Sequence, residues 1–366
     1  MDVHWRFIPA ARNSYAALYA ACEQEGFVLE PVGAPSPEVT CYSLNSLNAS
    51  RYLKEIQNAR CVTIVGGPHA TACPAEMAKF ADYVIVGEGE YLLPALLRSL
   101  EKGGPVPAGV ATANGFMPAD HCVRLDRYPP FSTMKGYIEI SRGCPHACAY
   151  CQTPRIFGPH MRHRGIDAIT RAARRFRDAR FVTPNALAYG SDGRTPRLEK
   201  VKHLLSALQH KDQHIYFGTF PSEVRPEWVT RDAIELVTTY CTNTRLHFGA
   251  QSGSDRVLSL LNRGHTVNDV IRAVELCLES GLEPVVDCIV GIPGEEDEDQ
   301  LMTARLVEWI SRRGRVHLHR CIPLPGTPLG GKSPRELLPE VERLLGTLAL
   351  KGRVTGSWGD PTRRFF

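Results

Sequence analysis

Three cysteines within a span of eight residues constrain this chain more than any other feature. Cys144, Cys148 and Cys151 lie in the segment CPHACAYC, with gaps of three and two residues between them. This spacing puts three thiols on one short loop, and cysteine thiolates at such close spacing hold iron–sulfur clusters. A structural zinc site uses four ligands, and no fourth cysteine lies nearby. The missing ligand favours a cluster with one iron open to bind another molecule, with zinc completed by His146 or His160 as the alternative.

Length and composition exclude several classes of protein. The chain has 366 residues, enough for two domains that each bury a core. Its 43% apolar and 22% charged residues are typical of a soluble globular protein. The net charge of +4 is small, and the basic residues form short local clusters, so charge does not favour a nucleic-acid partner. Without a signal peptide or an apolar stretch of about 20 residues, we expect a cytoplasmic protein that does not enter a membrane.

The first third of the chain predicts a Rossmann-like domain. Residues 1–125 alternate apolar strands with amphipathic helices, the pattern of a parallel sheet covered on both faces. The first helix is expected to begin at a cap on Asn13 or Ser14 and to end at Gly26. Strands are expected at Val39–Ser43, Cys61–Val65 and Asp82–Val86. The segments SLNSLN, GGPHAT and GEGE follow them, where a doubly wound sheet has its ligand crevice. Tight turns without a ligand are the alternative.

The rest of the chain predicts a second α/β domain. Residues 105–135 are rich in Pro, Gly and Ala, which indicates a linker that continues to about residue 135. Over residues 136–330, strands are expected near 137–141, 186–190, 215–219, 246–250, 284–290 and 316–321. Six repeats predict a partial (β/α)6 barrel whose site lies at the C-terminal mouth of the strands. The extension 331–366 is expected to pack one helix on the core. The predicted fold class is therefore α/β, with a Rossmann-like domain, a partial barrel and a short helical tail.

The cysteine segment resembles the motif of the radical S-adenosylmethionine (SAM) superfamily. The spacing, the aromatic Tyr150 before the third cysteine and the place after a strand all agree with that motif. The resemblance implies that the three thiols hold a [4Fe-4S] cluster and that SAM chelates its fourth iron. It also implies that an external low-potential electron donor drives cleavage of SAM to a 5′-deoxyadenosyl radical. The protein then orients the cofactors and excludes water.

Later strand ends are similar to the SAM-holding positions of that superfamily. The resemblance places the amino group of SAM at Ser191 and Asp192, although the segment departs from the usual GGE. It places the ribose at Glu223 and the carboxylate at Arg225, whose planar guanidinium can grip it with two hydrogen bonds; an ordinary surface ion pair is the alternative. Further candidates for SAM or substrate contact are Tyr150, Gln251, Ser252, Arg263, Ile292 and Gly294. The segment PLPGTPL is expected to form a loop at the barrel mouth.

The first domain resembles the cobalamin-binding domain that precedes many radical SAM barrels. The segments CVTIVGGPHAT and YVIVGEGE carry this resemblance, which implies cobalamin as a third cofactor. No DxHxxG motif occurs, so cobalt is expected without a histidine below it, and His69 lies in the wrong loop for that role. The contacts that the resemblance implies are Ser43, Asn45, Asn48, Gly66, Gly67, His69, Thr71 and Gly87.

Together these segments resemble the cobalamin-dependent radical SAM methylases. The lone SLNSLNA segment is similar to the subgroup that modifies methyl-coenzyme M reductase, which implies methylation of an unactivated carbon, specifically the Cα of a glutamine in that protein. The partner is then a protein or peptide substrate.

Two alternatives remain. A tRNA methylthiotransferase shares the GAQSGS and RGHT segments but carries a second cluster on three N-terminal cysteines. Here Cys22, Cys41, Cys61 and Cys73 fall mostly in strands and helices that are predicted as core. A non-catalytic cobalamin carrier or iron–sulfur sensor is the other alternative, and the intact SAM-side loops speak against it.

Overall fold

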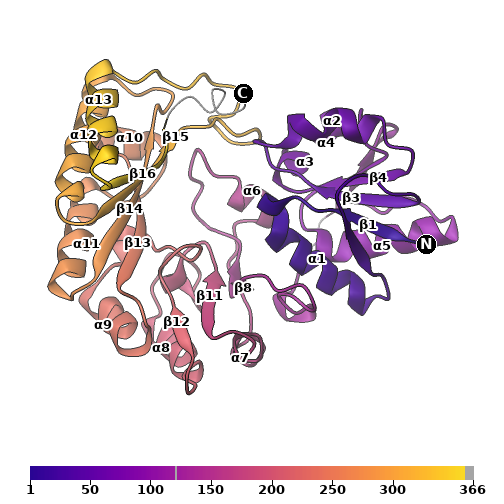
Figure 1. Ribbon diagram of the computed structural model, residues 1–366, viewed down its shortest axis with the longest axis horizontal. Coiled ribbons are helices and arrows are strands. Elements are labelled where there is room, and N and C mark those ends of the chain that lie inside the picture. Colours follow the sequence, from indigo (N-terminus) through magenta and orange to yellow (C-terminus); the bar gives the residue numbers. More distant parts are fainter. Residues whose placement is uncertain (120–121, 359–366) are drawn as a thin grey trace.

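The computed structural model describes residues 1–119 and 122–358, and it places two α/β units side by side (Figure 1). The first unit is a seven-stranded sheet in the order β2-β1-β3-β4-β5-β6-β7. The five strands from β2 to β5 in that order are parallel, and β6 and β7 add an antiparallel edge. The strands are β1 Val3–Arg6, β2 Leu29–Val32, β3 Val39–Ser43, β4 Val62–Gly66, β5 Tyr83–Ile85, β6 Val110–Thr112 and β7 Gly115–Phe116.

Helices cover both faces of this sheet, as the sequence pattern predicted. One buried cluster joins the sheet to α1 and α5 through Tyr15 and Leu93, and a second joins it to α2 and α4 through Ile56 and Met77. The helices are α1 Arg12–Gln24, α2 Ala49–Gln57, α3 Pro68–Ala72, α4 Pro74–Met77 and α5 Gly89–Lys102.

Two local predictions in this unit were wrong. Helix α1 begins at Arg12 because a turn over Pro9–Ala11 leads into it, and Ala11, not Asn13 or Ser14, is its N-cap residue. Asn13 Oδ1 instead accepts a hydrogen bond from Tyr137 N at 3.3 Å, across to the second unit. The linker is also shorter than predicted, since β6 and β7 extend the sheet into it.

The second unit is an arc of parallel strands. Three strands pair in the order β12-β11-β8 and four in the order β13-β14-β15-β16, and a bridge between Val224 and Phe248 joins the two sets. A short antiparallel pair, β9 Ser141–Arg142 and β10 Arg162–His163, holds the ends of the cysteine segment. The parallel strands are β8 Ile138–Glu139, β11 Asp178–Val182, β12 His214–Tyr216, β13 Arg245–Gln251, β14 Glu283–Val290, β15 Arg315–Arg320 and β16 Val354–Ser357.

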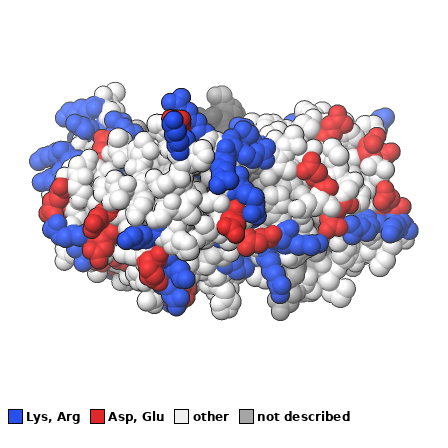
Figure 2. Space-filling model, turned by 90° about the horizontal axis from the view of Figure 1, so that it is seen from below, with Lys and Arg blue, Asp and Glu red and all other residues white. Residues whose placement is uncertain are grey.

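Helices pack on the outside of this arc, so the predicted partial barrel is present. They are α6 Thr153–Phe157, α7 Ile166–Ala173, α8 Leu198–Ala207, α9 Arg231–Tyr240, α10 Asp255–Leu260, α11 Val267–Glu279, α12 Asp297–Ser311 and α13 Pro339–Leu350. No helix of the described residues is long and apolar enough to cross a bilayer. On the face seen in Figure 2, acidic side chains are interspersed with groups of basic ones, of which one lies near the middle.

The barrel departs from the predicted strands at two places. The strand expected at 186–190 lies at 178–182, because Pro184 offers no N–H to a sheet and residues Ala186–Ala188 form a tight helical turn. The tail does carry the expected helix, α13, with Val341, Leu345 and Leu348 buried. It also adds β16, which pairs with β15 and gives the arc a seventh parallel strand.

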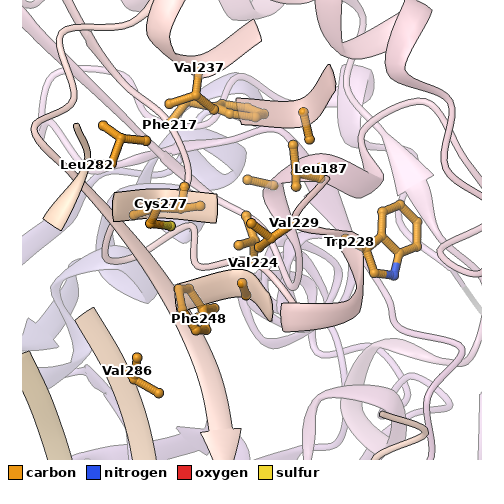
Figure 3. Close-up of a cluster of buried hydrophobic side chains, with 14 of the residues drawn as sticks. Leu187, Phe217, Val224, Trp228, Val229, Val237, Phe248, Cys277, Leu282 and Val286 are labelled. Carbon is orange, nitrogen blue, oxygen red and sulfur yellow. The ribbon is translucent and has the colours of Figure 1, made fainter. Parts of the chain in front are cut away.

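The hydrophobic core of the barrel lies between the strands and the outer helices (Figure 3). Phe248 on β13 and Val286 on β14 face Val237 of α9 and Cys277 of α11 in this cluster. The alternate residues on these strands and on β15 point the other way, into the barrel. They include the half-buried His247 on β13, Asp287 on β14 and His317 on β15. Apolar burial therefore lies outside the strand arc, while its inner face carries polar groups.

Replacing Phe248 with alanine tests how much the hydrophobic core between the strands and the outer helices contributes to stability. Phe248 is fully buried, so Phe248→Ala removes a whole aromatic ring from the cluster and is expected to lower the free energy of unfolding by about 3–5 kcal/mol. Urea titration followed by circular dichroism measures this loss. Met302→Ala on the exposed side of α12 is the control, and an equal loss in both variants would contradict the core assignment.

Candidate functional site

The three cysteines line one cavity at the barrel mouth, called here the thiol cavity. Its volume is about 210 Å³, and its other walls come from the ends of successive strands. Asn185 follows β11, Glu223 follows β12, Gln251 ends β13 and Asp287 lies on β14. Parallel strands bring their carboxyl ends to the same edge, which is why residues far apart in sequence meet the thiols here.

The cysteine segment is a closed loop, called here the cluster loop, residues 143–160. At Gly143 (φ +86°) a Cβ atom would lie 2.1 Å from the backbone oxygen of His160, so only glycine fits. Cys144 N donates to Gly158 O at 3.1 Å, and Cys151 N donates to Cys148 O at 3.1 Å. These bonds hold the thiols in place at the cavity wall: Cys148 is buried, and Cys144 and Cys151 are half-buried.

Arg263 supplies positive charge beside the thiols. Its Nη1 lies 3.8 Å from Cys148 Sγ and donates to Tyr150 Oη at 3.0 Å, and its Nη2 donates to Gly249 O at 2.8 Å. Burial raises the pKa of Cys144, and the neighbouring cysteines raise it further, against the charge of Arg225. Thiolates on this wall therefore depend on positive partners, either these arginines or iron.

The arrangement of the thiols fits a cluster better than a single metal ion. Among residues 1–119 and 122–358, no three His, Cys, Asp or Glu side chains converge on one point as a zinc ion requires. In a cubane cluster each thiolate binds a different iron, and three thiols that line one cavity agree with this requirement. His146, the nearer zinc candidate, instead contacts Gly193 O through Nε2 at 3.0 Å, and burial lowers its pKa to about 4.

Five of the predicted SAM or substrate contacts line the thiol cavity: Tyr150, Glu223, Arg225, Gln251 and Arg263. The backbone of Gln251 has φ +70°, and a register shift between Gly249 and Gln251 bends β13 at this point. Burial raises the pKa of Glu223. Arg225 donates to Glu227 and to Arg263 O, which fixes its guanidinium at the wall.

The other predicted contacts, Ser191, Asp192, Ser252, Ile292 and Gly294, do not line the cavity. Ser191 Oγ donates to Ala188 O at 2.9 Å and accepts from Gly193 N at 3.0 Å, so its hydroxyl is used within its own turn. Asp192 is exposed and accepts two backbone N–H bonds at 2.8 Å, which lowers its pKa. Ile292 is fully buried behind the cluster loop, packed in a cluster with Ala149.

Sequence reasoning missed two residues of the thiol cavity. Asn185 is 4% exposed, and neither its Oδ1 nor its Nδ2 has a hydrogen-bond partner among the described residues. Asp287 forms no ion pair with another described residue, and burial, followed by the charge of Glu223, raises its pKa to about 7. The signal for Asp287 was a single carboxylate inside the apolar run PVVDCIV. Buried polar groups without partners in a cavity favour a ligand-binding role.

The titration of Asp287 predicts a pH dependence of stability. Its folded pKa, about 7, lies above the ordinary 3.8, so between these values the folded chain keeps a proton that the unfolded chain has lost. Stability is therefore expected to fall as the pH rises through this window. Urea midpoints at pH 5 and pH 8 should show a smaller fall in Asp287→Asn than in the unaltered chain. An equal fall of the urea midpoint in both proteins would contradict the assignment of this pH dependence to Asp287.

A second cavity, called here the interdomain cavity, lies between the two units. Its volume is about 270 Å³, and its walls include Trp5, Leu18 and Leu93 from the first unit and Tyr137 and Phe157 from the second. Of the predicted cobalamin contacts, this cavity is lined by Ser43, Gly66, Gly67 and Gly87.

The other predicted cobalamin contacts hold the neighbouring loops together instead. Asn48 Oδ1 accepts from Asn45 N at 2.9 Å, and Asn45 Oδ1 accepts from Leu47 N at 3.0 Å. His69 Nδ1 lies 3.1 Å from Ser46 Oγ, and Thr71 Oγ1 accepts from Gly87 N at 3.0 Å. These side chains shape the cavity from behind without lining it.

Residues 138–307 match the family model described as the Radical SAM superfamily. The match begins at β8 and includes the three thiols, Arg263 and Asp287. This part of the chain is similar to a radical SAM domain, and the prediction that the chain is an enzyme is confirmed. The cluster loop supplies three thiols and no fourth cysteine. This agrees with the [4Fe-4S] cluster of that superfamily, whose fourth iron binds SAM.

Curated proteins with similar sequences include an uncharacterized protein of Methanopyrus kandleri. The identity is 26% over 379 residues, with 84% of this chain and 71% of that protein covered. A tRNA-2-methylthio-N(6)-dimethylallyladenosine synthase of Anaplasma phagocytophilum is also 26% identical, with 83% of this chain and 68% of that enzyme covered.

Two solved structures are similar over nearly the whole chain. TsrM of Kitasatospora setae, a radical S-adenosylmethionine methyltransferase with cobalamin and a [4Fe-4S] cluster bound, has a TM-score of 0.68 and 16% identity, and the match covers 90% of this chain and 74% of TsrM. OxsB, a cobalamin-dependent S-adenosylmethionine radical enzyme with aqua-cobalamin bound, has a TM-score of 0.63 and 16% identity, and the match covers 96% of this chain and 58% of OxsB. These likenesses confirm the predicted fold class.

Proposed function

We propose that the chain is a cobalamin-dependent radical SAM methyltransferase that acts on an unactivated carbon. The observation that carries the proposal is that one loop borders both cavities. Cys144, Cys148 and Cys151 of the cluster loop line the thiol cavity, while Ile156 and Phe157 of the same loop line the interdomain cavity. When bound, the cluster with SAM supplies a carbon-centred radical and cobalamin supplies a methyl group. A substrate beside this loop is within reach of both.

The walls of the interdomain cavity support a corrinoid as its occupant. A Cβ atom on Gly87 would meet nothing within 4 Å, and one on Gly66 would make only ordinary contact with Ile85 at 3.7 Å. The bare backbone at these turns lets a large planar ligand approach closely. The apolar side chains of Trp5, Leu18 and Leu93 offer a surface for its ring.

The thiol cavity supports a revised set of SAM contacts. The family places the amino group of SAM after the second barrel strand, and Asn185 occupies that place with an unpaired amide, whereas Ser191 and Asp192 do not reach it. Glu223 is the proposed partner of the ribose hydroxyls, and Arg225 that of the carboxylate. Tyr150 and Arg263 hold the wall beside Cys148 and exclude water from it.

For the substrate, we propose the Cα of a glutamine in methyl-coenzyme M reductase, supported by the SLNSLNA resemblance. An extended peptide could be held by main-chain hydrogen bonds at the barrel mouth. The PLPGTPL loop, residues 323–329, lies there: Gln152 Nε2 donates to Pro325 O at 2.8 Å. The same loop approaches the first unit, since a Cβ atom on Gly326 would lie 3.3 Å from Ala72 Cβ. Peptide and both cavities would then share one entrance.

A tRNA methylthiotransferase is the second candidate, favoured by the sequence similarity to the synthase of Anaplasma phagocytophilum. It requires a second cluster on N-terminal cysteines. Cys22 and Cys41 are fully buried in the core of the first sheet, and burial raises the pKa of each thiol. These thiols are placed for packing, which favours the methyltransferase.

Metal analysis of the anaerobically reconstituted enzyme separates the two candidates. About four irons with one cobalt per chain supports the methyltransferase, and about eight irons without cobalt supports the methylthiotransferase. The enzyme is then incubated with SAM, a strong reductant and a peptide that spans the reductase glutamine. One added methyl by mass spectrometry, with S-adenosylhomocysteine and 5′-deoxyadenosine in comparable amounts, is expected. Methylation of an arginine peptide or a tRNA in its place would refute the substrate and leave the reaction class.

A further inference from the structure

The two ends of the cluster loop are each marked by an arginine. Arg142 directly precedes the loop and Arg162 follows it, and the two are paired residues in the short antiparallel ladder of β9 and β10. The residues that hold these two side chains therefore also hold the two ends of the cluster loop in place. In both cases the partners include carboxylates from helix α5 and its N-cap, in the other unit.

Arg142 is surrounded by three carboxylates. Its Nη2 donates to Glu90 Oε1 at 2.6 Å and to Glu139 Oε2 at 2.7 Å, and its Nε donates to Glu139 Oε1 at 2.8 Å. Its Nη1 lies 3.5 Å from Glu88 Oε1. The guanidinium carbon also lies 5.2 Å from the centre of the Phe157 ring, so the loop folds back over its own anchor.

Arg162 is held by the same helix end. It forms two parallel bonds with Glu88, from Nη2 to Oε1 at 2.5 Å and from Nη1 to Oε2 at 3.0 Å. It also donates to Val123 O and to Phe157 O at 2.7 Å each. A bidentate arginine–carboxylate pair is the most directional ion pair that proteins form. Glu88 thus touches both arginines and holds the loop ends together.

These charges are buried, so the contact between the two units requires each charged group to keep its partner. Glu88 is 5% exposed, Glu90 7% and Arg142 7%. Burial acts to raise the pKa of Glu90, but the charge and hydrogen bonds of Arg142 outweigh it and hold the pKa below its ordinary value. A buried charge that loses its partner is strongly unfavourable, so α5 and the loop ends must move together.

The same residues form part of the interdomain cavity. Glu88 and Glu90, which follow the Gly87 turn, line it together with Glu139 and Arg142 of the second unit. A molecule bound in this cavity therefore rests on the network that fixes the cluster loop. The cluster, bound on the other side of that loop, acts on the same network from the thiol cavity.

We propose that Glu88 and Glu90 are positioning residues that couple the two cavities, so that cluster assembly and corrinoid binding strengthen each other. This inference rests on the proposed function, which supplies the two ligands. By thermodynamic linkage the coupling is reciprocal: the factor by which the cluster tightens corrinoid binding equals the factor by which the corrinoid tightens cluster binding.

The test is a comparison of hydroxocobalamin affinity in cluster-free and cluster-loaded enzyme, measured by equilibrium dialysis. In the unaltered chain the loaded form is expected to bind about 5-fold tighter or more, the lower end of typical couplings. In Glu90→Gln and Glu88→Gln this ratio should fall toward one. Glu101→Gln, at the far and exposed end of the same helix, is the matched control and should keep the full ratio.

Further readouts keep the outcomes distinct. Circular dichroism checks that each variant is folded. If Glu90→Gln is unstable, Glu90→Asp is measured in its place. It keeps the charge, so it should retain part of the affinity ratio. A ratio of one in the unaltered chain, or an unchanged ratio in both variants, would overturn the inference. If the unaltered chain binds no hydroxocobalamin, the cobalamin part of the proposed function fails. The positioning role is then decided by the electron paramagnetic resonance spectrum of the reduced cluster with SAM, and unchanged spectra in both variants would overturn it.

Discussion

Alanine at Cys144, Cys148 or Cys151 is expected to reduce SAM cleavage to background. Each thiol lines the same cavity, and the cluster loop contains no fourth cysteine that could replace a lost one. Loss of one thiolate leaves an iron without a protein ligand and the cluster without a stable site. The measurement is 5′-deoxyadenosine formation with SAM and a strong reductant, together with iron content per chain.

Cys122→Ala provides the matched control. Cys122 is exposed and does not line the thiol cavity, so this variant should keep its iron and its activity. Undiminished 5′-deoxyadenosine formation in any of the three loop variants would remove the assignment of the cluster to this loop.

Valine at Gly67 is expected to empty the interdomain cavity of cobalamin while iron content stays unchanged. Gly67 is one of the predicted corrinoid contacts, but the expected loss has its cause within the protein. At Gly67 (φ +97°) a Cβ atom would lie 2.6 Å from Leu44 O, 2.8 Å from Leu44 N and 2.9 Å from Ser43 Oγ. The variant must therefore displace the loop after β3, which forms one wall of the cavity.

The neighbouring glycine separates this effect from a general loss of stability. A Cβ atom at Gly66 would make only ordinary contacts, with Ile85 Cβ at 3.7 Å, Ile85 O at 3.9 Å and Tyr42 O at 4.0 Å, so Gly66→Ala should retain most of its cobalt. Cobalt and iron counts after reconstitution are compared for both variants. Full cobalt in Gly67→Val would show that the loop after β4 is only a turn.

Strand β3 was predicted at its observed bounds. It is buried at every position, and its residues, which are mostly β-branched or aromatic and lie between turn segments, are typical of a strand. β11 was misplaced because its sequence, DARFV, places charged residues on the inner side of the arc and hides the apolar signal. β16 was missed for a similar reason, since VTGS is short and polar and is a strand only because β15 offers it an edge.

The candidate site was predictable where a residue type is tied to one chemistry, and much less so elsewhere. Three grouped thiols have few uses, so their role followed from spacing alone. Ser191 and Asp192 were chosen from a strand placed too late, and the true strand end brings Asn185 to the cavity instead. Asn45 and Asn48 were plausible ligand contacts, but each had a backbone N–H within reach. Which hydrogen bond a side chain makes depends on neighbours that only the folded chain supplies.

The inner face of the barrel has a consequence for how such a protein can change over evolutionary time. His247, Asp287 and His317 point into the arc, while the residues between them carry the packing against the helices. Asp287 also lines the thiol cavity, whereas His247 and His317 do not. Substitutions at His247 or His317 can therefore alter the polar inner face over evolutionary time, while the apolar layer and the loop that holds the thiols stay as they are.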